Sequence, residues 1–209
     1  MKYYLKEEFL HDVNAKNAGN KARNDVESIV KEEGYHPLVL SVDNWYQMST
    51  LAAQRHKAKA FSQALDQLKQ GDELLIQFPM LHHSFFSTHL VKKAQKRGIK
   101  VYLLIHDLEV LRHANMTSLP LKHRIRMYLQ EASFLKAADG IIAHNPVMKS
   151  VLVGKGIAED KIVSLGIFDY LIPNFQEKSG QTKDQPIIVA GNLAQEKAGY
   201  LYALPAQPD

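Results

Sequence analysis

The sequence predicts an α/β fold, a Rossmann-like doubly wound parallel sheet covered by helices. Short runs of apolar, β-favouring residues alternate with longer segments of helical spacing. Six strand–helix steps follow one another within about 170 residues, which is typical of an open parallel sheet. Glycines stand where three of the expected helices stop, at Gly34, Gly71 and Gly98.

The first half of the chain supplies three strands and two helices. They are expected at Lys2–Leu5 (strand), 20–33 (helix), 37–42 (strand), Ser49 or Thr50 through Lys69 (helix) and 73–79 (strand). The long helix is amphipathic, and its expected core-facing residues are Leu51, Ala58, Phe61, Leu65 and Leu68.

The second half continues the alternation. The expected elements are a helix at 84–98, a strand at 100–107, a helix at 121–138, a strand at 140–145, a short helix starting at Pro146 and a strand at 161–166. The helix at 121–138 has its apolar stripe at Leu121, Ile125, Leu129, Ala132 and Leu135.

A break in composition falls at residues 174–185, which carry Gly, Ser, Gln and charges but little to bury. We therefore expect a domain at 1–173, a linker at 174–185 and the beginning of a truncated second domain at 186–209. Residues 186–192 form a further expected strand, and one strand with part of a helix is too little for a stable domain.

Composition narrows the function classes. Of 209 residues, Lys and Arg number 26 against 22 Asp and Glu, so the net charge of +4 does not require nucleic acid as a partner. The chain has no cysteine, which excludes disulfides, thiolate zinc sites and a cysteine nucleophile. No signal-peptide core or membrane-spanning apolar run is present, so we expect a cytoplasmic protein that at most lies on a membrane surface.

Polar residues at strand ends are the candidates for chemistry, because ligands of open parallel sheets bind beyond the carboxyl ends of the strands. His106 and Asp107 end the strand at 100–107, where a histidine can act as a base and a carboxylate can orient it. The alternative is that His106 bonds to backbone and Asp107 caps a helix. Gln77, Phe78 and Pro79 end another strand.

His144 and Asn145 form another polar strand end. Asn145 precedes Pro146 and is well placed to cap the next helix, whereas His144 can bind ligand or serve the fold. Gly166, with residues 167–170 after it, ends the last expected strand at the same edge.

The segment 16–25 lies between the first strand and the first helix, where backbone amides can bind phosphate. It can equally be a flexible turn capped by Asn20, with Lys21 and Arg23 in solvent. No G-x-G-x-x-G occurs, which argues against a nucleotide-dependent oxidoreductase.

A metal site is not expected. His82, His83 and His89 have neither the spacing nor the neighbouring carboxylate of a metal-binding motif. The basic stretch at 121–130 can meet an anionic membrane or acceptor, although a solvated helix face is the simpler interpretation.

A series of motifs resembles the bacterial glucosyltransferase 3-like and β-1,6-galactofuranosyltransferase family. In chain order they are NAGNK, FP at a strand end, IHDLEVLR, ADGIIAHNPVMKSVL, LGIFDYL and VAGNL. The resemblance implies the amino-terminal part of a GT-B type glycosyltransferase with two Rossmann domains, with no metal and no cofactor. The implied substrates are a nucleotide sugar, usually a UDP-sugar, and a glycan, glycolipid or glycoprotein acceptor.

By this resemblance, His106 and Asp107 lie near the reacting hydroxyl. The residues implied near the donor or its phosphates are Asn17, Gly19, Asn20, Lys21, Gly191 and Asn192. Those implied at the cleft rim are His144, Gly166, Phe168 and Asp169. A non-catalytic acceptor-binding or assembly subunit, completed by a partner chain, is the alternative function. Homo-oligomer formation is compatible with either function, and a nucleic-acid partner is not expected.

Overall fold

The architecture comes from a computed structural model that describes residues 1–8, 18–108, 120–127, 131–166, 171 and 198–203. Contacts within the chain divide it into two units, Met1–Leu171 and Ile172–Asp209. In the second unit the described element is a 3-10 helix, η5 (Gly199–Ala203). The expected linker at 174–185 and the expected strand at 186–192 lie outside the described residues, so the domain boundaries stay a prediction.

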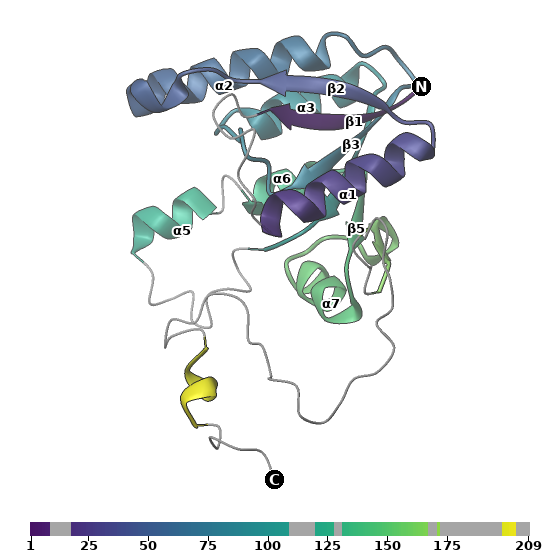
Figure 1. Ribbon diagram of the computed structural model, residues 1–209. Coiled ribbons are helices and arrows are strands. Elements are labelled where there is room, and N and C mark those ends of the chain that lie inside the picture. Colours follow the sequence, from purple (N-terminus) through teal and green to yellow (C-terminus); the bar gives the residue numbers. More distant parts are fainter. Residues whose placement is uncertain (9–17, 109–119, 128–130, 167–170, 172–197, 204–209) are drawn as a thin grey trace. The chain divides into compact units, whose positions relative to one another are not determined.

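The first unit contains a six-stranded sheet in which every neighbouring pair is parallel. The strands are β1 (Lys2–Glu8), β2 (His36–Ser41), β3 (Glu73–Phe78), β4 (Lys100–Ile105), β5 (Gly140–Ala143) and β6 (Ile162–Ser164), in the spatial order β2-β1-β3-β4-β5-β6. The predicted Rossmann-like, doubly wound sheet is thus confirmed (Figure 1).

Strand order reverses between β1 and β3, which makes their carboxyl ends the switch point where such folds bind ligands. The two strands also separate there. Pairing of β1 with β3 covers Lys2 to Tyr4, whereas pairing of β1 with β2 continues to Glu8. The last residues of β1 are therefore held to β2, and β3 leaves room for side chains beside them.

Helices cover both faces of the sheet (Figure 1). They are α1 (Ala18–Glu32), α2 (Thr50–Leu65), α3 (Ser87–Lys96), α5 (Leu121–Met127), α6 (Ser133–Ala137) and α7 (Pro146–Gly154), with short 3-10 helices η1 (Trp45–Gln47) and η4 (Glu159–Lys161). The larger core joins one sheet face to α2, α3 and α6. On the other face, Val26 of α1 packs with Tyr4, Leu75 and Leu104.

Two predicted helix faces are wrong in part. In α2 the buried residues are Ala53, Lys57, Phe61, Ala64 and Leu65, while the side chain of Leu51 is 54% exposed. The true stripe contains a lysine, so apolar residues alone placed the face incorrectly at its amino-terminal end.

The helix expected at 121–138 is represented by α5 and α6, and residues 128–130 between them lie outside the described residues. In its expected apolar stripe, Leu121 and Ile125 are exposed, whereas Leu135 is buried. No helix among the described residues is long and apolar enough to cross a membrane.

Candidate active site

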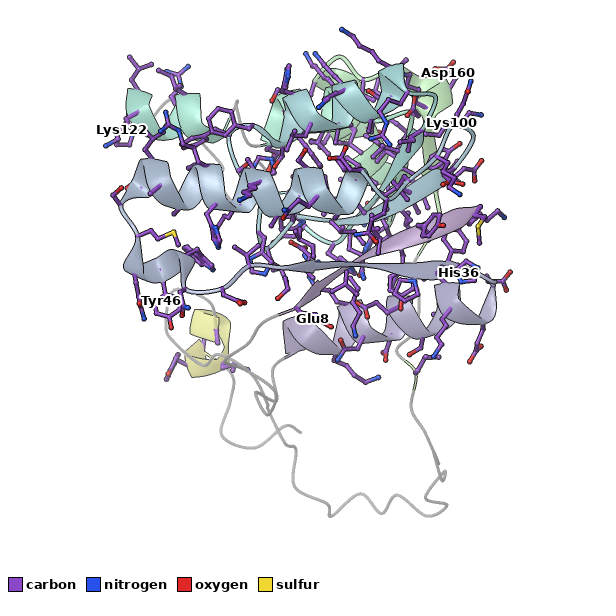
Figure 2. The ribbon with its side chains drawn as sticks, turned by 90° about the horizontal axis from the view of Figure 1, so that it is seen from above. Glu8, His36, Tyr46, Lys100, Lys122 and Asp160 are labelled. Carbon is purple, nitrogen blue, oxygen red and sulfur yellow. The ribbon has the colours of Figure 1, made fainter. Side chains whose placement is uncertain are left out.

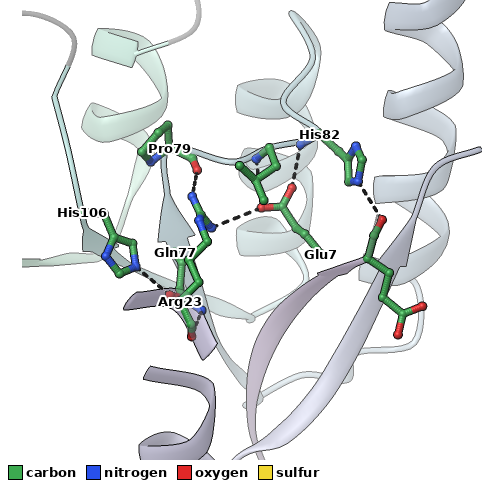
Figure 3. Close-up of polar contacts among 8 residues, drawn as sticks. Glu7, Arg23, Gln77, Pro79, His82 and His106 are labelled. Carbon is green, nitrogen blue, oxygen red and sulfur yellow. Dashed lines mark hydrogen bonds and ion pairs between the residues drawn. The ribbon is translucent and has the colours of Figure 1, made fainter. Parts of the chain in front are cut away.

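Glu7 is the buried acid of the switch point. It is the penultimate residue of β1, and its side chain is only 4% exposed. The loop that follows β3 donates two backbone hydrogen bonds to it, from Leu81 N at 3.0 Å and from His82 N at 2.7 Å (Figure 3). The carboxylate therefore fixes this loop against the end of β1.

Arg23 of α1 completes a set of polar contacts, the bracket, which consists of Glu7, Arg23 and the backbone of residues 79–82. Its Nη1 lies 3.7 Å from Glu7 Oε2, and its Nη2 donates a hydrogen bond to the carbonyl of Pro79. The guanidinium thus joins α1, β1 and the loop after β3, in which the Phe78–Pro79 peptide is cis. Of the two interpretations of the segment 16–25, the one that puts Arg23 in solvent is wrong for this residue, because its side chain is only 14% exposed.

Gln77 connects this bracket to β4. It is a buried residue of β3 whose Nε2 donates to the Arg23 carbonyl at 3.3 Å. Its Oε1 is then the atom that faces His106 Nε2, at 2.6 Å (Figure 3). Because an amide oxygen only accepts, the network assigns the ring proton of His106 to Nε2.

The remaining nitrogen of His106, Nδ1, is consequently the proton acceptor of the ring. Among the described residues, no hydrogen-bond partner meets it. The ring of His144 lies beside it, with the two centroids 6.1 Å apart and the planes nearly perpendicular. Gln77 of β3 is thereby brought together with the residues that directly follow β4 and β5.

Burial controls the pKa values of these groups. Loss of solvation raises the pKa of Glu7, against its backbone hydrogen bonds and the charges of Arg23 and Lys57. It also lowers the pKa of Arg23, and it lowers the pKa of His106 to about 4 with smaller effects from Arg23 and His144. Perturbed groups concentrated at a switch point are typical of a functional site.

The predicted site residues divide into three groups. His106 and His144 meet, and Asp107 follows directly as a partly buried residue. Gly166 follows β6 with a φ of 83°, a left-handed conformation that favours glycine. Asn145 caps α7 as expected, its Oδ1 accepting from Met148 N at 2.8 Å.

The second group is the phosphate loop. Lys21 Nζ bonds Asp25 at 2.5 Å and the Leu171 carbonyl at 2.5 Å, so its charge is already engaged within the chain. Gly19 and Asn20 lie in the first turn of α1. The third group, Asn17, Phe168, Asp169, Gly191 and Asn192, lies outside the described residues.

Sequence analysis missed Glu7 because the opening strand was ended at Leu5. In the structure, β1 continues beyond Leu5 through Glu8. The available signal was a pair of acids at the end of the first strand of a parallel sheet, where a ligand crevice is expected.

The three histidines at 82, 83 and 89 do not converge. His82 Nε2 lies 3.1 Å from the Glu8 carbonyl, while His89 is exposed on α3. Within the described ranges, no group of three or more His, Asp or Glu side chains is placed to hold a metal ion. Independence from metal stays a prediction.

Comparison with known proteins agrees with the motif resemblance. The family model "Glucosyltransferase 3-like, N-terminal domain" matches residues 2–167. The β-1,6-galactofuranosyltransferase WbbI of Escherichia coli (strain K12) is 30% identical over 202 residues, which cover 93% of this chain and 54% of the relative. The chain therefore spans about half the length of that curated relative.

A solved structure, the apo form of the lipopolysaccharide outer core galactosyltransferase WaaB, covers 79% of this chain and 45% of its own. Its TM-score to this chain is 0.45 and its sequence identity is 13%. The family match extends over β1 to β6 and includes Glu7, Arg23, Gln77, His106 and His144. The chain belongs to the glucosyltransferase 3-like family, of which it contains the amino-terminal domain.

Proposed function

We propose that the protein takes part in glycosyl transfer, moving a hexose such as galactofuranose or glucose from a UDP-sugar to a saccharide or glycoconjugate acceptor. The observation that carries this proposal is the buried network Glu7–Arg23–Gln77–His106 at the switch point of a glucosyltransferase 3-like domain. We assign the acceptor side of the reaction to this domain. The donor-binding half belongs to a second Rossmann domain of GT-B type, which begins after the linker.

In the proposed reaction an acceptor hydroxyl attacks the anomeric carbon, the bond to the diphosphate breaks, and the hydroxyl proton must be removed. His106 Nδ1 is the atom suited to receive that proton, because Gln77 holds Nε2 as the protonated nitrogen. A pKa of about 4 makes the free ring a weak base. A bound diphosphate places negative charge nearby, which raises the pKa of a histidine toward the working pH.

Asp107 and the cations have supporting parts in this proposal. Asp107 orients the acceptor hydroxyl beside His106. Arg23 offers positive charge at the switch point, and in a metal-free site such groups and helix amino termini must neutralise the leaving diphosphate. Asn17, Gly19, Asn20, Lys21, Gly191 and Asn192 stay proposed donor contacts, and Phe168 and Asp169 proposed rim residues.

A non-catalytic role is the alternative: the chain binds acceptor and is completed by a partner that binds the donor. Homo-oligomer formation is a further proposal compatible with both functions.

We infer a cytoplasmic site of action in polysaccharide biosynthesis, with peripheral contact to the membrane through α5. Leu121 and Ile125 are 68% and 51% exposed, and they are neighbours at i and i+4 among the exposed cations Lys122 and Arg124. Sedimentation with anionic lipid vesicles tests this contact. Replacement of both apolar residues by serine should abolish co-sedimentation, and unchanged co-sedimentation would argue against α5.

The direct test of function is transfer of labelled hexose from UDP-galactofuranose and UDP-glucose to an oligosaccharide acceptor. The chain is assayed alone and together with the carboxyl-terminal half of the galactofuranosyltransferase relative as a separate polypeptide. Transfer in either arm that requires this chain supports catalysis. Acceptor binding without transfer in both arms supports the non-catalytic role, and neither binding nor transfer would refute both.

A further inference from the structure

Lys57 is an anomaly in the core-facing stripe of α2. It stands one turn from Ala53 and one turn from Phe61, both buried, and is itself only 7% exposed. Lysine is rarely buried to this extent unless its ammonium is paired. Since α2 begins just after the carboxyl end of β2, this turn of the helix lies at the ligand-binding edge of the sheet.

The ammonium of Lys57 interacts with the ring of Trp45 and, at longer range, with the charge of Glu7. Its Nζ lies 3.5 Å from the ring centroid of Trp45, a cation–π contact. Among the described residues, no hydrogen-bond acceptor is assigned to it. Glu7 acts on it through charge, but both Glu7 oxygens already accept backbone hydrogen bonds. Burial lowers the pKa of Lys57, which is the signature of a cation that lacks solvation.

His83 is the second buried polar group without a hydrogen-bond partner among the described residues. Its two ring nitrogens are shielded from solvent and have no hydrogen-bond partner in the described part of the chain. The ring stands edge-on to Phe134, with centroids 5.1 Å apart. Burial, followed by the charge of Lys57, lowers the pKa of His83 to about 4, so the ring is neutral and can donate one hydrogen bond. Buried polar atoms are almost always bonded, so such atoms call for an explanation.

We propose that Lys57, with His83, binds a phosphate or carboxylate group of a substrate, beside Glu7. An anion supplies what both groups lack, namely a charged acceptor for the ammonium and a hydrogen-bond acceptor for the imidazole. The inference rests on the proposed function for its substrates: the anion comes from the diphosphate of the donor or from an acidic sugar in the acceptor. His106 then serves the reacting hydroxyl from the β4 side.

Trp45 is the only tryptophan of the chain, so its fluorescence reports this place alone. The experiment titrates the 209-residue protein with pyrophosphate, UDP, glucuronate and, as a neutral control, glucose, at constant ionic strength. We expect a saturable change in Trp45 emission with at least one anion and none with glucose. A stronger response to pyrophosphate and UDP assigns the subsite to the donor, and a stronger response to glucuronate assigns it to an acidic acceptor.

Two substitutions on the same helix make the test specific. Lys57→Met keeps the length of the side chain and should weaken the anion response about tenfold or more, as expected for loss of a charged hydrogen bond. Lys59→Met removes an exposed lysine from the same helix and should change nothing. His83→Phe should weaken binding by a smaller factor while the native circular dichroism spectrum is kept.

The proposal is overturned if no anion changes Trp45 emission, if glucose acts as the anions do, or if Lys57→Met binds them as well as the parent protein. Because the readout is binding, its failure is separable from failure of the transfer assay. A protein that transfers hexose yet shows no response at Trp45 retains the proposed function and loses this subsite.

Discussion

The environment of charged groups differs between the two ends of the strands in the parallel sheet, the amino edge and the carboxyl edge. At the amino edge, Asp72 accepts hydrogen bonds from the Met1 amine at 2.6 Å and from Lys69 N at 2.8 Å. These bonds lower the pKa of Asp72, as in an ordinary stabilising ion pair. At the carboxyl edge, burial raises the pKa of Glu7 and lowers the pKa of Lys57 and His106.

Other groups follow the same division. Arg97 satisfies the carbonyls of Leu65 and Leu68 at the amino edge, and Asp139 accepts from Val101 N just before β5. In Figure 2, His36 and Lys100, at the amino ends of β2 and β4, lie on the right, and Tyr46, beyond the carboxyl end of β2, lies on the left. The amino edge pairs its charged groups in ordinary ion pairs and hydrogen bonds, whereas the carboxyl edge keeps charged groups poorly solvated, as active sites do.

The largest expected effect comes from breaking the bracket at the carboxyl edge. Arg23→Met leaves the carboxylate of Glu7 buried without its cation, and we expect a loss of about 3 kcal/mol in the free energy of unfolding. Urea denaturation measures this. Lys149→Met, which removes an ion pair with the exposed Glu159, should cost less than about 1 kcal/mol. Equal losses in the two variants would show that the bracket is an ordinary surface pair.

The next effect concerns catalysis. His106→Ala removes the proposed proton acceptor and should lower transfer about 100-fold, the lower range for loss of a general base. His89→Ala, at an exposed position on α3, should leave the rate unchanged. If His106→Ala keeps full activity in the assay that uses both halves, His106 is not the base.

The pH dependence of the free energy of unfolding is a further difference between the two edges. His83 and His106 have pKa values lowered to about 4, so the folded state binds their protons less readily than the unfolded chain does. Their contribution to stability is present above pH 6.5 and is lost as the pH falls from 6.5 toward 4. His83→Leu should flatten the stability curve in this window, measured by denaturation at each pH. An unchanged slope would contradict the burial of this ring.

The smallest effect is expected at the amino edge. Asp72→Asn removes the ion pair with the exposed Met1 amine and should cost about 1 kcal/mol, with no loss of transfer or anion binding. Because the pKa of Asp72 is lowered, its contribution is present above the ordinary value of 3.8 and is lost as the pH falls below it. A change in substrate binding in this variant would contradict the claim that the amino edge takes no part in binding substrates.

Sequence patterns predicted most of the fold because strand and helix periodicities are local properties. The strand order, by contrast, depends on pairings between distant segments, so the switch point between β1 and β3 could not be located from periodicity. Strand ends alone were enough to select His106 and His144.

Glu7, Arg23 and Lys57 escaped prediction because their burial depends on neighbours far along the chain. Arg23 meets the carbonyl of Pro79, and Glu7 meets the amides of Leu81 and His82. Charged residues in a single sequence are expected to be solvated, and only the assembled sheet shows which of them are enclosed.

The central claim is that substrates bind at the carboxyl edge of the sheet. Backbone NMR shift mapping tests it most directly, with UDP-galactose and a methyl hexoside acceptor added separately to the labelled protein. The account predicts perturbed amides at Glu7, at 77–78, at 80–83 and at His106, with those of Asp72, Arg97 and Asp139 unchanged. Perturbations centred on the amino edge, or none with either ligand, would contradict it.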